Sequence, residues 1–116
     1  MPLYNPSTNS TGVIRMPIGI TTQTSSSQIP QGAIVQEASL EVATPYTGGT
    51  LITLGLAGGD PAAFMLGHHN RPSVLGIYQI PQYTPVATSS AFRATVLGSP
   101  SMGAGYAVVT YMIPDS

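Results

Sequence analysis

IPQGAIVQEASLEVATPYTGGTLITLGL, residues 29–56, carries the clearest secondary-structure pattern in the chain. Along residues 34–42 the side chains alternate with the two-residue period of a β-strand, so that one face is mainly apolar and the other mainly polar. Gly48-Gly49 then supplies the positive φ angles of a tight reversal, and residues 51–56 run back as a nearly continuous apolar strand. The stretch therefore predicts two antiparallel strands joined as a β-hairpin. Its core face would consist of Ile34, Ala38, Leu40 and Val42.

The rest of the chain contains further strand-like segments, separated by turns rich in glycine and proline. These segments are residues 11–20, 73–80, 86–97 and 106–113. In the first of them, Pro17 cannot donate a ladder hydrogen bond, so this strand is expected at a sheet edge or at a bulge. Residues 21–27, TTQTSSS, are compatible with either a polar edge strand or an exposed loop. Pro81 and Pro85 are expected to bracket another turn.

One segment between the strands has helical signals. Asp60 followed by Pro61 fits an N-cap with proline at the first helical position. A single helical turn is therefore predicted over residues 62–66, and Gly67 would end it.

Six to eight short strands without a long helix predict an all-β fold, either an antiparallel β-sandwich or a jelly roll, with one short helical turn. The length of 116 residues is that of one domain, which we place at residues 11–116. Residues 1–10 are polar, contain two prolines and show no periodicity. They are predicted to form a flexible N-terminal arm that becomes ordered on a neighbour.

The composition is poor in charge. Charged residues make up 6% of the chain, against about 25% in ordinary soluble domains. A net charge of −1 disfavours electrostatic binding of nucleic acid or of an anionic membrane. Ser, Thr, Gln and Asn take the place of charges on the surface, and such groups are cheap to desolvate when they find partners. Two interpretations stay open: permanent contact with other proteins, or a small all-β domain that is merely charge-poor.

Several classes of site and location are disfavoured. The absence of cysteine excludes disulfides and thiolate chemistry, and no apolar run approaches the roughly 20 residues of a transmembrane helix. The first residues lack the features of a signal peptide, so synthesis in a cytosol is the default expectation.

No catalytic, cofactor or metal site is predicted. His68 and His69 are adjacent and have no third ligand at a recognisable spacing, so a loop contact with a neighbouring subunit is favoured. Glu37 and Glu41 lie on one strand face but roughly 13 Å apart, which favours a solvated face on which one glutamate is free to pair with an arginine of a neighbouring chain. No G-x-S-x-G elbow occurs.

Tyrosine and arginine side chains near turns are the best candidates for a protein interface, because a tyrosine ring supplies buried area and its hydroxyl a hydrogen bond. The arginines would act as charge-assisted anchors. The interface candidates are Tyr4, Tyr46, His68, His69, Arg71, Tyr83, Arg93 and Tyr106.

The run IPQGAIVQEASLEVATPYTGGTLITLGLAGGDPAAFM, residues 29–65, resembles a pattern found in small structural proteins of tailed bacteriophages. The shared features are a proline-x-Gly-Ala start, an alternating strand, a glycine turn, an apolar strand and a Gly-Asp-Pro/Ala-Ala-Phe segment. The resemblance implies a capsid decoration, or cement, protein. Such a protein is a β-sandwich dimer or trimer, made in the bacterial cytoplasm, that clamps major capsid proteins on the virion surface.

We expect the contacts to involve residues 1–10 and the loops at residues 68–72 and 98–105, with multivalency strengthening modest interfaces. Three alternatives stay open. A phage tail or fibre component would share the same pattern. A carbohydrate-binding β-sandwich would use Tyr78, Tyr83 or Tyr106 as a sugar platform. An enzyme would need a convergent His-acid-Ser site that the spacing does not reveal.

Overall fold

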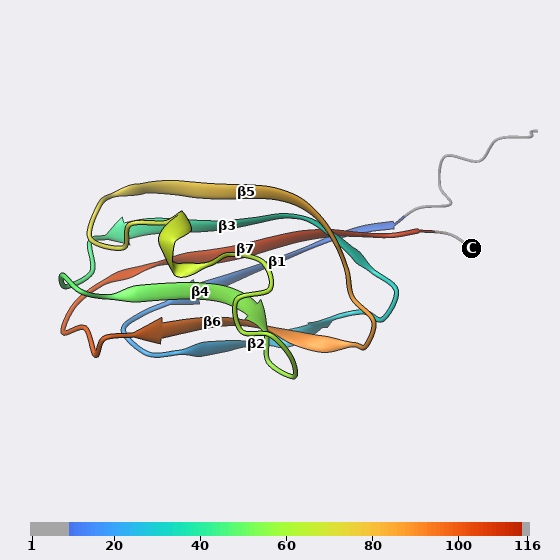
Figure 1. Cartoon of the computed structure of the whole chain (residues 1–116), viewed down its shortest axis with the longest axis horizontal. Coiled ribbons are helices and arrows are strands. Elements are labelled where there is room, and N and C mark those ends of the chain that lie inside the picture. Colours follow the sequence, from blue (N-terminus) through green and yellow to red (C-terminus); the bar gives the residue numbers. More distant parts are fainter. Residues whose placement is uncertain (1–9, 115–116) are drawn as a thin grey trace, which may run out of the picture.

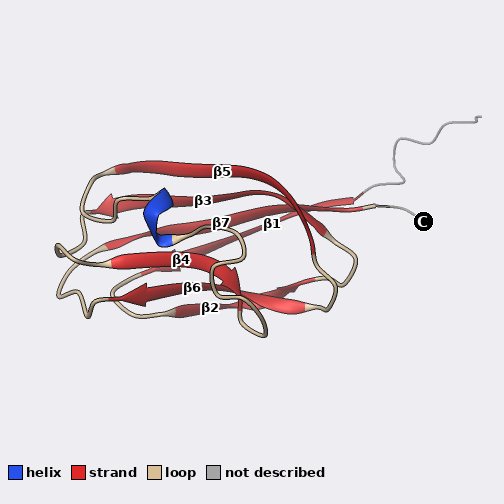
Figure 2. Ribbon diagram, in the orientation of Figure 1, coloured by secondary structure: helices blue, strands red, loops and turns tan. Residues whose placement is uncertain are grey.

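Seven strands in residues 10–114, the part of the chain that the computed structural model describes, form two antiparallel sheets packed face to face (Figures 1 and 2). The strands are β1 (Ser10–Ile18), β2 (Gln23–Ile29), β3 (Ile34–Thr44), β4 (Leu51–Leu56), β5 (Gly76–Pro85), β6 (Ser90–Leu97) and β7 (Ala104–Ile113). One sheet has the order β1-β7-β3-β5 and the other β2-β6-β4. The predicted antiparallel β-sandwich is confirmed. Tyr4 and residues 1–9 of the expected arm lie outside the described residues, and Ser10 already belongs to β1.

The core forms between the inner faces of the two sheets. In β1 the even-numbered Ile14, Met16 and Ile18 are buried, whereas the odd-numbered residues between them are exposed. The same alternation buries Ala38, Leu40 and Val42 of β3, as predicted from the pleat. Val35 is buried as well, since the register of β3 shifts between Val35 and Glu37.

The predicted pairing of β3 with β4 is wrong, although both strands exist. β3 pairs with β5 and β7, whereas β4 pairs with β6 in the other sheet. Gly49 has the expected positive φ of 86°, but residues 45–50 carry the chain from one sheet to the other. The physical reason is that both strands turn their apolar faces to the same core from opposite sides, so they cannot be neighbours in one sheet.

Two local predictions are also wrong. Residues 62–66 form a turn and a bridge to β4 instead of a helix, with the Phe64 N–H donating to the Leu54 carbonyl (2.9 Å). Within residues 10–114, the helical turn is the 3-10 turn η2 (Gly67–His69), where the sequence predicted a helix end. Pro81 and Pro85 lie inside β5, and β5 tolerates them because it is an edge strand. No helix in the described part of the chain is long and apolar enough to cross a bilayer.

The polar run TTQTSSS contributes to edge strand β2, whose pairing with β6 slips between Thr24 and Gln28. Side-chain hydroxyls take over from the backbone there. Thr22 Oγ1 accepts the Val96 N–H (3.1 Å), and Ser25 Oγ accepts the Phe92 N–H (3.0 Å). Serine and threonine thus satisfy donors of β6 that the irregular backbone ladder leaves open.

Candidate interaction surfaces

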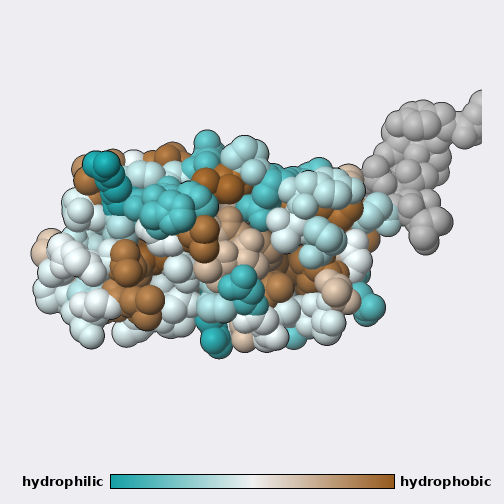
Figure 3. All heavy atoms as spheres, in the orientation of Figure 1, coloured by the Kyte–Doolittle hydropathy of each residue, from teal (hydrophilic) through white to brown (hydrophobic). Residues whose placement is uncertain are grey.

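Most exposed large apolar side chains lie at the end of the sandwich opposite Ser10 and Pro114 (Figure 1). Four connections meet at this end: residues 19–22, 45–50, 70–75 and 98–103. We call the following residues, which are 43–62% exposed, the apolar end: Ile20, Leu51, Val74, Leu75, Ile77, Leu97 and Met102. Figure 3 shows apolar side chains in brown at this end, over the start of β4 and the end of β6.

The apolar end is hollowed on one side. Leu51 and Leu97 are directly opposite each other on β4 and β6. A groove of about 460 Å³ lies beside Leu97, and Ile20 and Pro100 are also among its lining residues. The surface therefore offers both projecting aliphatic groups and a depression beside them.

Tyr46 holds this end together from the inside. Its side chain is 3% exposed, its hydroxyl donates to the Gly19 carbonyl (2.8 Å) and its N–H donates to the Pro72 carbonyl (2.8 Å). Its ring fills the space where a Cβ atom on Gly103 would lie. Burial raises the pKa of the Tyr46 hydroxyl above its ordinary value of 10.0. Tyr46 therefore contacts all three of the other connections.

Two further side chains brace the loops. Thr47 Oγ1 accepts hydrogen bonds from the N–H groups of Ser101 (2.9 Å) and Met102 (3.2 Å). The Tyr78 hydroxyl lies 3.0 Å from the Arg71 carbonyl and 2.9 Å from the Val74 carbonyl. The connections that carry Val74 and Met102 are thus held by hydrogen bonds, whereas Leu51, Ile77 and Leu97 lie on strands.

A second surface, the outer face of the β1-β7-β3-β5 sheet, carries a small charged cluster. The Arg15 guanidinium lies 3.6 Å from the centre of the Tyr106 ring and reaches Glu41 Oε1 at 3.9 Å. The arginine that faces Glu41 thus comes from the same chain, whereas the sequence suggested one from a neighbour. Both groups are well exposed, so the pair contributes little to stability.

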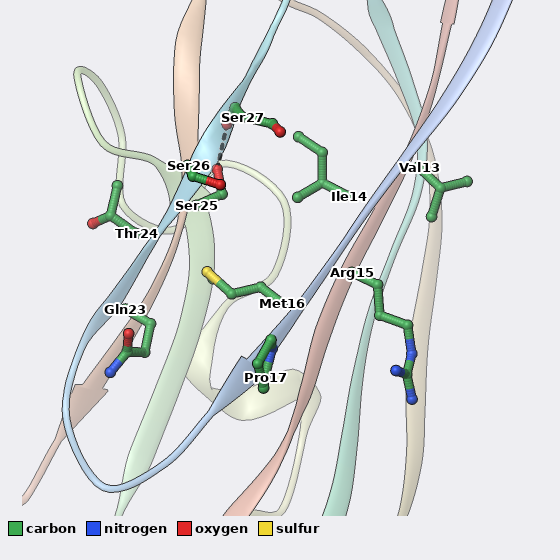
Figure 4. A pocket seen from close by; sticks show the side chains of 10 residues that line it. All are labelled: Val13, Ile14, Arg15, Met16, Pro17, Gln23, Thr24, Ser25, Ser26 and Ser27. Atoms are coloured by element: carbon green, nitrogen blue, oxygen red, sulfur yellow. Dashed lines mark hydrogen bonds between the residues drawn. The ribbon is translucent and has the colours of Figure 1, made fainter.

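A third feature is a groove of about 450 Å³ between β1 and β2 (Figure 4). Ile14 and Met16 point toward β2 in this view, whereas Val13 and Arg15 point away from it. Hydroxyl groups of residues 25–27 line the opposite side. No aromatic side chain lines this groove, so it offers no stacking platform for a sugar.

The two histidines are held by local contacts. His69 Nδ1 accepts the Leu66 N–H (3.1 Å), and the rings of His68 and His69 are 4.3 Å apart. Within residues 10–114, no group of three or more His, Asp or Glu side chains could hold a metal ion.

The sequence-predicted interface residues are spread over the molecule. Tyr46 is buried in its own fold, and Tyr106 lies under Arg15. Tyr83 is 75% exposed on β5, and the half-buried Arg93 donates from Nε to Thr24 on the outer face of the other sheet. Two of the predicted residues in the described part of the chain belong to connections at the apolar end: the buried Tyr46, and the exposed Arg71 beside His68 and His69.

The two loops expected to make contacts, at residues 68–72 and 98–105, both hydrogen-bond to residues 45–50, through the carbonyls of Pro72 and Met102. Ser10, where the described chain starts, lies at the end opposite the apolar end and pairs with Ile113. Sequence reasoning missed the aliphatic residues of the apolar end, since their exposure depends on which strand face is covered. The one usable signal was the apolar character of both faces of residues 51–56.

Chains of three bacteriophage capsid structures share this fold. The first, in the acidic stable capsid structure of Helicobacter pylori bacteriophage KHP30, has a TM-score of 0.70 at 15% identity, covering 90% of this chain and 89% of that one. A chain of the cyanophage Pam1 capsid asymmetric unit has a TM-score of 0.62 at 21% identity (98% and 92% covered). A chain of the capsid of Ralstonia phage GP4 has a TM-score of 0.56 at 15% identity, covering 100% of this chain and 92% of that one. The sequence matches no protein-family model and no curated protein.

Proposed function

We propose that this chain is a non-enzymatic structural protein of a tailed-bacteriophage virion, namely a decoration or cement protein. It binds major capsid proteins on the capsid surface and bridges neighbouring subunits. The observation that carries the proposal is the fold, which chains of three phage capsid structures share over 90–100% of this chain. At the level of identity found, the likeness concerns the fold, so the role itself is our inference.

The geometry fits a stapling role. The two sheets form a scaffold whose loops are braced by Tyr46, Thr47 and Tyr78. A surface with few charges needs little desolvation of ions when it is covered. Many copies on one shell, or a dimer or trimer of the chain, would gain strength through effective concentration.

The experiment is a count of this chain in purified virions by quantitative mass spectrometry, together with co-sedimentation of the purified protein with heads that lack it. A copy number near that of the major capsid protein and saturable binding to heads are expected. A few copies per particle would place the protein in the tail or fibre instead. Absence from virions and no binding to heads would overturn the virion role.

A further inference from the structure

The apolar end holds seven of the exposed large apolar side chains in the described part of the chain. Leu51 and Leu97 lie on the outer face of the β2-β6-β4 sheet and Ile77 on the outer face of the other sheet, and the remaining four belong to the connections between the sheets. Seven such side chains, each about half exposed, offer on the order of 600 Å² of surface, against about 800 Å² per partner in a standard protein interface. Exposed apolar side chains gathered at one end of a domain make that end a candidate for an interaction site.

Charge is nearly absent from the connections that build this end. Residues 19–22, 45–50, 70–75 and 98–103 contain a single charged residue, Arg71. Arg15 and the glutamates lie on the strands of the larger sheet, where Glu41 is directly opposite Ile77, and Tyr83 lies toward the other end of β5. A complementary partner is therefore an apolar protein surface with a carboxylate at its edge that faces Arg71.

We infer that the apolar end is the surface that docks on the capsid shell, so that the sandwich stands end-on and the end with Ser10 and Pro114 points away from the shell. This inference rests on the proposed function, since the committed partner is an apolar patch of the assembled major capsid protein. The braced loops support it, because docking then needs no large rearrangement of the backbone.

The absence of cysteine allows a clean footprint of this orientation. Ser73→Cys introduces a thiol in an exposed position beside Val74, and Thr88→Cys places the matched thiol in the β5–β6 connection at the other end. On protein bound to heads, we expect maleimide labelling of Ser73→Cys to fall at least tenfold relative to free protein. Labelling of Thr88→Cys should change less than twofold. The reverse pattern, or no protection of either thiol, would overturn the orientation.

Charge insertion provides an independent test of the same surface. Leu75→Asp and Leu97→Asp are each expected to weaken binding to heads at least tenfold, whereas Tyr83→Asp, a similarly exposed residue elsewhere, should leave it within twofold. Circular dichroism confirms that each variant is folded. Equal effects of all three substitutions would contradict the assignment.

Two other outcomes have distinct meanings. Wild-type protein that does not bind heads at all refutes the proposed function, whereas binding through another face refutes only the orientation. If Leu97→Asp instead converts a dimer of the isolated protein into a monomer, by sedimentation velocity, the apolar end is a contact between copies and not the shell contact.

Discussion

Tyr46 is the residue on which the apolar end depends most. Its backbone N–H and its hydroxyl contact Pro72 and Gly19, residues far from it in the chain. The sequence predicts an interface role for this tyrosine because it flanks a turn. Local sequence cannot separate an exposed turn tyrosine from a buried one, since burial depends on the distant loops that cover it.

We expect Tyr46→Phe to lower the free energy of unfolding by about 1 kcal/mol, because the Gly19 carbonyl loses its hydrogen-bond donor while the ring packing stays. Urea denaturation followed by circular dichroism measures the change. The matched control is Tyr83→Phe, which alters an exposed ring and should stay within about 0.5 kcal/mol of wild type. Equal effects of the two substitutions would show that the buried hydroxyl does not stabilise the fold.

The raised pKa of Tyr46 predicts a dependence on alkaline pH. Above pH 10.0, the ordinary value, the unfolded chain loses the Tyr46 proton while the folded chain retains it. In this range the folded state binds more protons than the unfolded state. The free energy of unfolding therefore falls as pH rises from 10.0 through the pKa of Tyr46 in the folded protein. No lysine titrates in this range, because all three strong cations are arginines. Urea titrations at a series of pH values should show a steeper loss in wild type than in Tyr46→Phe, and parallel curves would argue against it.

At the scale of elements, β2 shows how a sequence with little pattern still forms a strand. TTQTSSS has no apolar alternation, so the pleat gives no signal of which face is inside. Its hydroxyls instead satisfy N–H groups of β6. The sequence therefore left strand and loop open, and the choice depends on a neighbour that lies much later in the chain.

Ser25→Ala tests this pairing. The variant leaves the buried Phe92 N–H without its acceptor, which should cost about 1–3 kcal/mol and speed amide exchange at Phe92. Ser26→Ala, a change of the same kind at an exposed neighbouring position, serves as the control and should have little effect. Hydrogen exchange by NMR and urea denaturation report the two quantities, and slow exchange at Phe92 in Ser25→Ala would count against the hydroxyl's role.

The wrongly predicted pairing of β3 with β4 shows a second limit of prediction from sequence. The alternation in residues 34–42 correctly predicts which side chains are buried, and Gly49 correctly predicts a turn. Neither feature specifies which strand lies alongside, because a pleated strand with one apolar face fits a hairpin and a crossing between sheets equally well. Tyr46 is buried in the connection that crosses from one sheet to the other, and its hydroxyl bonds to Gly19, which is distant in sequence.

At the scale of the whole molecule, the short strands were sufficient to predict the sandwich. The location of the exposed aliphatic side chains was not predictable in the same way. Leu51 and Leu97 read as ordinary strand residues in the sequence, and their exposure became evident only once β4 and β6 were found to pair with these side chains outward. An outward apolar pair is informative because the opposite face of the same strands already fills the core.

The apolar character of the proposed docking surface predicts how docking responds to salt. Ion pairs between exposed groups weaken as the screening length falls from about 30 Å at 0.01 M salt to about 3 Å at 1 M, whereas burial of apolar surface does not depend on screening. With Arg71 the one charge in the connections of the apolar end, the affinity for heads should fall less than about threefold between these concentrations of sodium chloride. Sodium sulfate should strengthen binding, because excluded salts favour burial. Co-sedimentation across both salt series measures this. A steep loss in sodium chloride would mean that ion pairs carry the contact, and loss of the salt dependence in Arg15→Gln but not in Arg71→Gln would then assign it to Arg15 and Glu41.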